Sequence, residues 1–167
     1  MPIALLTPAQ HEPMIDVLCE LHAHYNEAAT PNRAVVRHHF MTNLLAADSP
    51  LRLAVAARDD GVISGFAAFL LMHSVVEPAP EKGRQCALKE LFVRPRERSR
   101  GVGHSLMVWL ARHAVEQACC RIDWPVNIVN ARGIAFYEGL GAERVAERLS
   151  YRLSGHRLER LAHGETP

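Results

Sequence analysis

The chain has 167 residues, of which 49% are hydrophobic, and its 19 lysines and arginines nearly balance its 18 aspartates and glutamates. This length suits a single domain, residues 1–167, with a substantial core, and the balanced charge gives no electrostatic footprint for nucleic acid or an anionic membrane surface. The opening residues lack a signal-peptide pattern, no stretch is long enough to span a membrane, and the four cysteines lack zinc-site spacing. We therefore expect a cytoplasmic protein with free thiols, no bound metal, and no nucleic acid or membrane partner.

The first part of the chain is predicted to be helical. Thr7 and Gln10 have capping-box spacing, but Pro13 indicates that the regular helix begins only after it. Apolar residues then recur at helical spacing up to Tyr25. A second helix is expected over residues 33–47.

A hairpin is predicted next. Two apolar stretches flank the pair Asp60-Gly61, and an Asp-Gly turn in this context is a strong hairpin signal. We expect antiparallel strands at 51–58 and 62–75. The segment 77–85, which holds two prolines and a glycine, is expected to be a loop.

The second half contains a predicted strand–helix–strand unit. A strand at 86–93 leads through a charged segment into a glycine loop, and a helix of about four turns follows beyond Gly103. A buried strand is expected at 121–129. Asn130 then caps a short helix, which Gly141 ends in a left-handed conformation.

A final strand is expected at 142–153. The element order is then β, α, α, β, β, β, α, β, α, β. This order indicates an α+β protein, with a hairpin in its first half and a strand–helix–strand unit in its second.

The glycine loop RSRGVG has the features of an anion site. The first N–H groups of the following helix have no intrahelical partner, and the helix dipole is positive at that end. Gly101 and Gly103 permit close approach of the backbone, while Arg98 and Arg100 add positive charge. The loop matches neither a Walker motif nor the dinucleotide fingerprint, because Leu106 stands where the latter needs its third glycine.

Two motifs together point to a family. RSRGVG follows a strand ending in ELFVRP, and NARGIAFYEGLGA begins at Asn130. These motifs resemble the cofactor motifs of the GNAT superfamily, the GCN5-related N-acetyltransferases, and LKELFV, DWPV and FYEGLGA are most similar to its small-amine and polyamine branch. The resemblance covers nearly the whole chain and implies a GNAT fold, with a central, mostly antiparallel sheet of six to seven strands, a parallel strand–helix–strand unit and flanking helices. It also implies acetyl-CoA as cosubstrate, no metal, direct transfer in a ternary complex, and a homodimer.

The resemblance further implies roles for particular residues. The backbone amides of Phe92 and Val93 would face the thioester. Asn130 would contact the pantetheine arm, and Tyr137 would donate a proton to the departing thiolate. The pyrophosphate would lie against the backbone amides of Arg98, Ser99, Arg100, Gly101, Val102, Gly103 and His104.

Acetyl transfer to an amine also needs a base. A primary amine with a pKa of about 10 is mostly protonated at pH 7, so a carboxylate has to take its proton during attack. Glu90 is the candidate, because strand alternation places it on the face opposite Leu91. Its neighbour Lys89 departs from the paired acids common in the polyamine branch, which weakens a strictly polycationic acceptor. His22 and Tyr25 are expected to contribute to the pocket for the acceptor amine.

Each assignment has a simpler alternative. The loop is compatible with a basic surface turn, Tyr137 with a core aromatic, Asn130 with an N-cap alone, and Glu90 with a salt-bridged surface carboxylate. The alternative functions are a protein or peptide N-acetyltransferase and a non-catalytic acyl-CoA-binding regulatory module. A small-molecule amine is favoured because the loop at 76–84 and the helices near 20–40 are placed to enclose a small acceptor. Retention of Tyr137 and Glu90 argues against a non-catalytic module.

Overall fold

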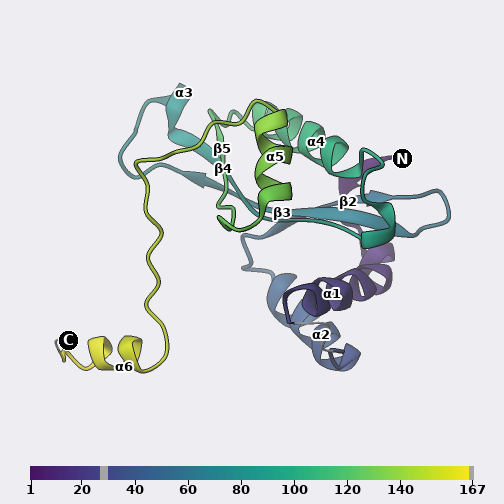
Figure 1. Cartoon of the computed structure of the whole chain (residues 1–167), viewed down its shortest axis with the longest axis horizontal. Helices are drawn as coiled ribbons and strands as arrows, with labels where there is room; N and C mark the ends of the chain where they lie inside the picture. Colours follow the sequence, from purple (N-terminus) through teal and green to yellow (C-terminus); the bar gives the residue numbers. More distant parts are fainter. Residues whose placement is uncertain (27–29, 166–167) are drawn as a thin grey trace. The chain divides into compact units, whose positions relative to one another are not determined.

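The computed structural model describes residues 1–26 and 30–165. The chain divides into two compact units, residues 1–126 and 127–167. The first unit holds the sheet, and the second holds two helices, coloured green to yellow in Figure 1. The single domain expected over 1–167 stays a prediction.

A five-stranded sheet in the order β1-β2-β3-β4-β5 is the framework of the first unit. The first four strands run antiparallel to their neighbours, and β5 runs parallel to β4. This confirms the mixed α+β fold and its parallel strand–helix–strand unit, and β1 is the strand that opens the predicted order, although the described residues form five strands instead of six to seven. The strands are β1 (Ile3–Leu5), β2 (Arg52–Ala57), β3 (Ile63–His73), β4 (Arg84–Val93) and β5 (Ile122–Asp123).

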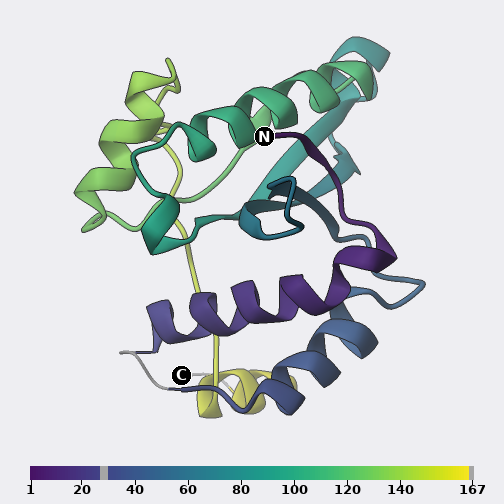
Figure 2. The same ribbon diagram turned by 90° about the vertical axis from the view of Figure 1, so that its right-hand side faces the viewer.

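Helices cover both faces of this sheet (Figure 2). α1 packs on one face with α2 beside it, and α4 packs on the other face. A π-helical turn at Phe40–Leu44 continues α2, so the helix expected over 33–47 forms but ends at Leu44. The helices are α1 (His11–Tyr25), α2 (Arg33–His39), α3 (Pro80–Gly83) and α4 (Val102–Glu116) in the first unit, and α5 (Ala131–Gly139) and α6 (His156–Ala162) in the second.

Strand alternation divides the core between the two faces. Phe66 and Ala68 of β3 belong to the cluster beneath α1 and α2. Phe69 points the other way and contacts the ring of Trp109 on α4, with 6.2 Å between the centroids. The buried members of the cluster under α1 are Met14, Ile15, Val17, Phe40, Leu53, Val55, Ile63, Phe66, Ala68 and Phe92.

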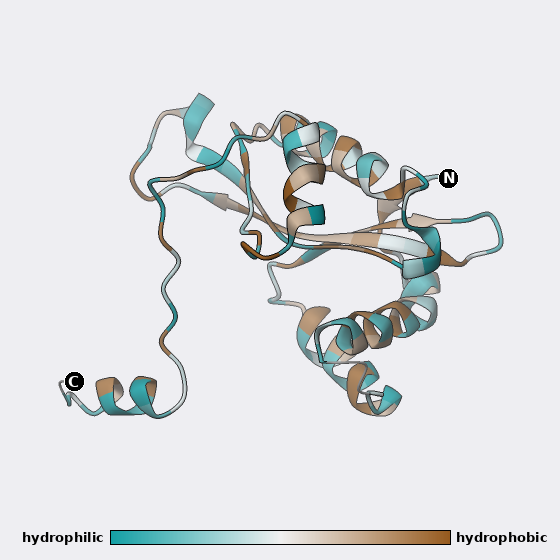
Figure 3. Ribbon diagram, in the orientation of Figure 1, coloured by the Kyte–Doolittle hydropathy of each residue, from teal (hydrophilic) through white to brown (hydrophobic). Residues whose placement is uncertain are grey.

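The predicted hairpin forms between β2 and β3. Gly61 has a φ of +81°, which a residue with a side chain rarely adopts. Asp60 supports the turn, because its Oδ1 accepts a hydrogen bond of 3.1 Å from the N–H of Val62. The turn itself is hydrophilic (Figure 3). The Asp60-Gly61 pair was therefore sufficient to predict this hairpin from the sequence.

The predicted start of α1 was wrong. The helix begins at His11, so Pro13 lies in its first turn. Proline has no N–H to donate, and the first turn of a helix has no carbonyl that would accept one. Proline is therefore tolerated at this position. The capping-box pair does form: the N–H of Thr7 donates to Oε1 of Gln10 over 3.0 Å and opens a 3-10 turn.

Three other segments differ from their predictions. No strand forms at 142–153, because the described part of the second unit contains no other strand to satisfy its backbone groups. The strand expected at 121–129 is reduced to the two residues of β5, and Pro125, which cannot donate a ladder hydrogen bond, lies just beyond it. The loop expected at 77–85 contains α3, and β4 already begins at Arg84.

Gly65 in β3 is required by the close approach of β4. A Cβ at this position would lie 2.6 Å from the carbonyl oxygen of Phe92 and 3.2 Å from the Cα of Val93. We expect Gly65→Ala to lower the free energy of unfolding by about 1–3 kcal/mol in urea denaturation, because backbone atoms have to move. Gly139→Ala is the control, since a Cβ there meets nothing within 4 Å. Equal stability of Gly65→Ala and the wild type would show that the two strands separate at little cost.

Candidate functional site

A β-bulge in β4 directs Glu90 toward α1. Ala68 of β3 pairs with Glu90 while the next residue, Phe69, pairs with Leu88, so Lys89 is the extra residue. Ala68 belongs to the cluster under α1, whereas Phe69 contacts α4. Without the bulge, Leu88 and Glu90 would share one face of the sheet. The bulge therefore places Leu88 and Glu90 on opposite faces of the sheet.

Tyr25, the last residue of α1, meets Glu90 on this face. Its hydroxyl donates toward the carboxylate, at 3.1 Å from Oε2 and 3.2 Å from Oε1. Burial raises the pKa of Glu90, and the hydrogen bonds from Tyr25 and from the backbone of Leu91 oppose that rise. Burial and the nearby carboxylate also raise the pKa of the Tyr25 phenol, which therefore remains a donor. Glu90 is thus a stronger base than a solvated glutamate.

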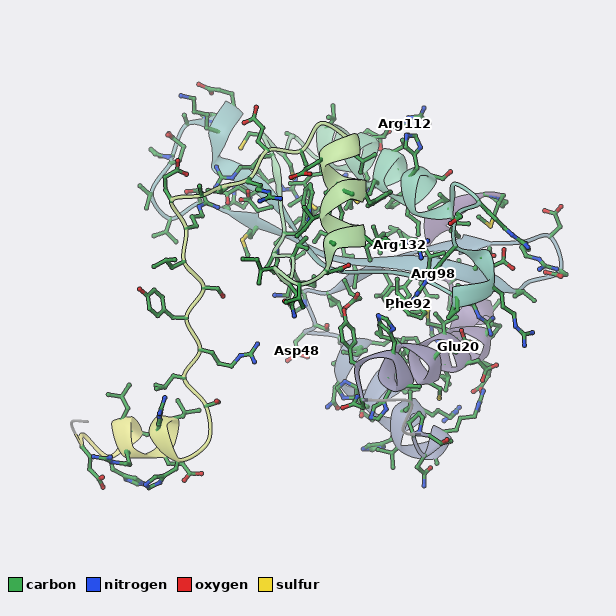
Figure 4. All side chains as sticks on the ribbon, viewed as in Figure 1. Glu20, Asp48, Phe92, Arg98, Arg112 and Arg132 are labelled. Atoms are coloured by element: carbon green, nitrogen blue, oxygen red, sulfur yellow. The ribbon has the colours of Figure 1, made fainter. Side chains whose placement is uncertain are left out.

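The ring of His24 lies next to those of Tyr25 and Phe92. The ring of His24 lies 5.3 Å from that of Tyr25 and 6.1 Å from that of Phe92, centroid to centroid. Phe92 lies between the sheet and α1 (Figure 4). The ring of Tyr25 is exposed and offers a π face to a positively charged ligand, and the carboxylate supplies the opposite charge. The cluster is therefore suited to a small cation.

The loop after β4 is tied back to the strand by Arg98. Its Nε donates a hydrogen bond of 3.0 Å to the carbonyl of Val93, and its guanidinium lies 5.9 Å from the ring centroid of Phe92. Ser99 and Gly101, with φ of +61° and +78°, then turn the chain into α4. The side chain of Arg98 thus holds the loop in place.

The N-terminus of α4 is open to an anion. Gly101 is the N-cap and supplies no side-chain acceptor, so the amides of the first turn, from Val102 to His104, have no partner within the helix. A Cβ at Gly101 would meet nothing within 4 Å, which leaves room above the backbone. The dipole of this 15-residue helix favours negative charge at this end. These features suit a phosphate-bearing ligand.

One edge of β4 is open beyond its first residues. β5 pairs with β4 only at Cys86 and Ala87, whereas β3 pairs along the opposite edge up to Val93. Among the described strands, none pairs with the β5-facing edge from Leu88 onward. Alternate backbone groups on this edge are available to an extended, amide-containing ligand. Phe92 and Val93, predicted to face the thioester, lie on this stretch.

Two predicted site residues belong to the second unit. Asn130 caps α5 as predicted, because its Oδ1 accepts a 2.9 Å hydrogen bond from the N–H of Gly133. Gly133 is needed there, since a Cβ would lie 2.5 Å from Nδ2 of Asn130. Tyr137 is half-buried on the same helix, with its ring edge-on to Phe136 at 5.1 Å. The cofactor roles of Asn130 and Tyr137 stay predictions.

Sequence reasoning missed His24 as part of the ring cluster. Its position directly before Tyr25, a predicted pocket residue, was a usable signal. His22 itself is exposed, and its place in the acceptor pocket stays a prediction. Within residues 1–26 and 30–165, no three His, Cys, Asp or Glu side chains are grouped to hold a metal ion. None of the helices in that part of the chain is long and apolar enough to cross a membrane.

Comparison with known proteins gives the following similarities. Residues 17–142 match the acetyltransferase (GNAT) family. The L-ornithine N5-acetyltransferase of Arabidopsis thaliana is 29% identical over 103 residues, which cover 62% of this chain and 43% of that protein. The thialysine N-epsilon-acetyltransferase of Bos taurus is 29% identical over 84 residues, 48% of this chain and 49% of that protein. The chain thus spans about half the length, or less, of these curated relatives.

Solved structures show the same fold. An integron cassette protein from the mobile metagenome of V. cholerae is 26% identical, with a TM-score of 0.86 over 96% of both chains. An aminoglycoside N-acetyltransferase solved in complex with CoA is 20% identical, with a TM-score of 0.65 over 92% of this chain and 100% of that one. The similarity to the aminoglycoside N-acetyltransferase shows a shared fold and nothing about substrate.

Proposed function

The chain belongs to the GNAT acetyltransferase family, and on that premise we propose that it transfers an acetyl group from acetyl-CoA to a primary amine of a small molecule. The family and the fold expected from the sequence are confirmed. The observation that carries the proposal is the half-buried carboxylate of Glu90, which lies beside Tyr25 of α1. Glu90 belongs to β4, the strand that leads through the glycine loop into α4. A homodimer in the cytoplasm, with no metal, remains part of the proposal.

The donor is assigned to the loop and the open strand edge. The uncapped amides of α4, with the loop from Arg98 to His104, are suited to the pyrophosphate of acetyl-CoA. The open edge of β4 offers backbone groups to the pantetheine amides. We assign to a backbone amide of Phe92 or Val93 the stabilisation of the oxyanion that forms at the thioester carbonyl. Asn130 is assigned to the same arm by family resemblance.

The transfer step follows from the charges that develop. The amine nitrogen attacks the thioester carbon, so that a C–N bond forms and the C–S bond breaks. The proton lost by the amine passes to Glu90, directly or through one water, and Tyr137 donates a proton to the departing sulfur. No acetylated enzyme forms, and both carboxylate and phenol regain their starting states by exchange with solvent.

The acceptor class is inferred from the surroundings of Glu90. A carboxylate with the exposed ring of Tyr25 beside it attracts an alkylammonium ion. The relatives are named for acetylation of ornithine and thialysine, both amines. We propose an acceptor of this chemical kind for this chain, with Lys89 beside Glu90 disfavouring long polycations.

An acceptor screen tests the proposed function. The protein is incubated with acetyl-CoA and, in turn, with diamines, polyamines, amino acids, aminoalkylphosphonates and peptides, and free CoA thiol is measured. We expect release with small primary amines. Preferential acetylation of peptides would instead support a protein N-acetyltransferase. Binding of acetyl-CoA without turnover on any acceptor would support the regulatory module.

Arg98→Met is expected to weaken the binding of acetyl-CoA about tenfold, because the loop loses its hydrogen bond to Val93 and its contact with Phe92. Isothermal titration calorimetry measures this affinity. Arg96→Met is the matched control, since it removes the same charge from an exposed position in the same segment. Equal losses in both variants would mean that Arg98 acts only through its charge.

A further inference from the structure

The contact between Tyr25 and Glu90 joins residues that are 65 positions apart in the chain. The two oxygens of Glu90 lie at nearly equal distances from the Tyr25 hydroxyl, 3.1 and 3.2 Å. The Tyr25 hydroxyl is therefore within hydrogen-bond distance of both carboxylate oxygens. A carboxylate has about four acceptor positions, so Glu90 can still accept from another donor besides Tyr25 and the backbone N–H of Leu91.

The hydroxyl of Tyr25 is not needed to hold α1 on the sheet. Met14, Ile15 and Val17 of that helix are fully buried in the core. In addition, Nε of Arg94 donates to Oε1 of Glu20 over 3.0 Å, which ties the same end of α1 to the segment after β4. Figure 4 marks Glu20 on α1. The Tyr25 hydroxyl is therefore free to serve the carboxylate instead of the fold.

The torsion of a carboxylate about its last bond is broad, so an unsupported Glu90 would rotate among several directions. A half-buried carboxylate also tends to take up a proton, and a protonated Glu90 cannot act as a base. A hydrogen bond from a neutral phenol counters both tendencies. It fixes the plane of the carboxylate and favours its charged form.

Resting on the proposed function, we propose that Tyr25 is a positioning residue for acetyl transfer: its hydroxyl aims the Glu90 carboxylate at the acceptor amine and keeps that carboxylate ionised. The other groups that act on Glu90 are His24 from α1 and the backbone N–H of Leu91 on β4. Its partner on β3 is Ala68, which carries no charge. Tyr25 is thus a neutral side chain that donates a hydrogen bond to the Glu90 carboxylate.

The first measurement is the pH dependence of amine acetylation by Tyr25→Phe, which keeps the ring and removes the hydroxyl. We expect kcat to fall about tenfold with the KM for the amine changed less than about twofold. The acidic limb of the kcat/KM profile should move to higher pH by about half to one unit, because the charged form of Glu90 has lost a donor. Tyr151→Phe is the control, since that tyrosine is 87% exposed on the second unit.

The second measurement does not depend on activity. The carboxyl carbon of Glu90 is titrated by ¹³C NMR in the protein without substrates, with Glu90→Gln used to assign the resonance. We expect Tyr25→Phe to raise the Glu90 pKa and Tyr151→Phe to leave it unchanged. An unchanged pKa together with an unchanged acidic limb would overturn the proposal, even if kcat fell. A raised pKa in a protein that acetylates no amine would uphold the coupling and reject the proposed function.

Discussion

Glu90→Gln is expected to lower kcat/KM for the amine acceptor by about 10²-fold or more, while the affinity for acetyl-CoA stays at the wild-type value. Glutamine has nearly the shape of glutamate and can still accept the Tyr25 hydrogen bond, but it cannot take a proton. The loss therefore falls on the step in which the amine becomes neutral. Steady-state kinetics and calorimetry measure the two quantities.

The pH profile separates a base from a binding group. In the wild type, kcat/KM should fall at acid pH as Glu90 becomes protonated, at a pH above that of an ordinary glutamate because burial raises its pKa. In Glu90→Gln that limb should disappear, leaving only the titration of the free amine. Glu81→Gln, at an exposed position of α3, should behave as wild type. A Glu90→Gln profile that matched the wild type would remove Glu90 as the base.

Stability should change in the opposite direction from activity. Since the folded-state pKa of Glu90 is raised, the folded protein binds this proton more readily than the unfolded chain. Above that raised pKa, the wild type keeps a half-buried charge that lowers its stability. Below the unfolded value both states are protonated, and the effect is gone. Glu90→Gln should therefore be at least as stable as wild type in urea at pH 7, and any gain should vanish as the pH falls toward about 4.

The sequence predicted those elements whose signals are local. Asp60-Gly61 specified the hairpin because a tight turn depends on the residues within it, and Asn130 predicted the start of α5 for the same reason. The segment 142–153 failed because its apolar pattern fits a strand only where another strand accepts it. A pairing partner is a property of the fold and cannot be read from one segment.

The site was predictable in its donor half and less so in its acceptor half. RSRGVG is continuous in sequence, and the structure places it at the uncapped end of α4 as expected from the spacing. The environment of Glu90 depends on the bulge at Lys89 and on Tyr25, which lies 65 positions away. Neither is encoded by a local pattern, so the sequence named Tyr25 as a pocket residue without its partner.

Tyr137→Phe is expected to lower kcat by about 10²-fold with little change in the affinity for acetyl-CoA, because in the proposed mechanism Tyr137 donates the proton to the departing sulfur. The substitution removes only the hydroxyl, and the ring can keep its edge-on contact with Phe136, so α5 should stay folded. Chemistry must be the slow step for the loss to appear, so single-turnover rates are measured. Tyr151→Phe again controls for the loss of an exposed phenol.

The nature of the leaving group gives this prediction its sharpest test. A thiol with a pKa of about 8.5 leaves with modest help, whereas the alkoxide of an oxygen analogue of acetyl-CoA is far more basic and depends more strongly on a proton donor. If Tyr137 is that donor, its replacement by phenylalanine should cost more with the oxygen ester than with the thioester. If Tyr137 only packs or binds the donor, the two esters should suffer equally. An equal loss would therefore remove Tyr137 as the proton donor to the leaving group.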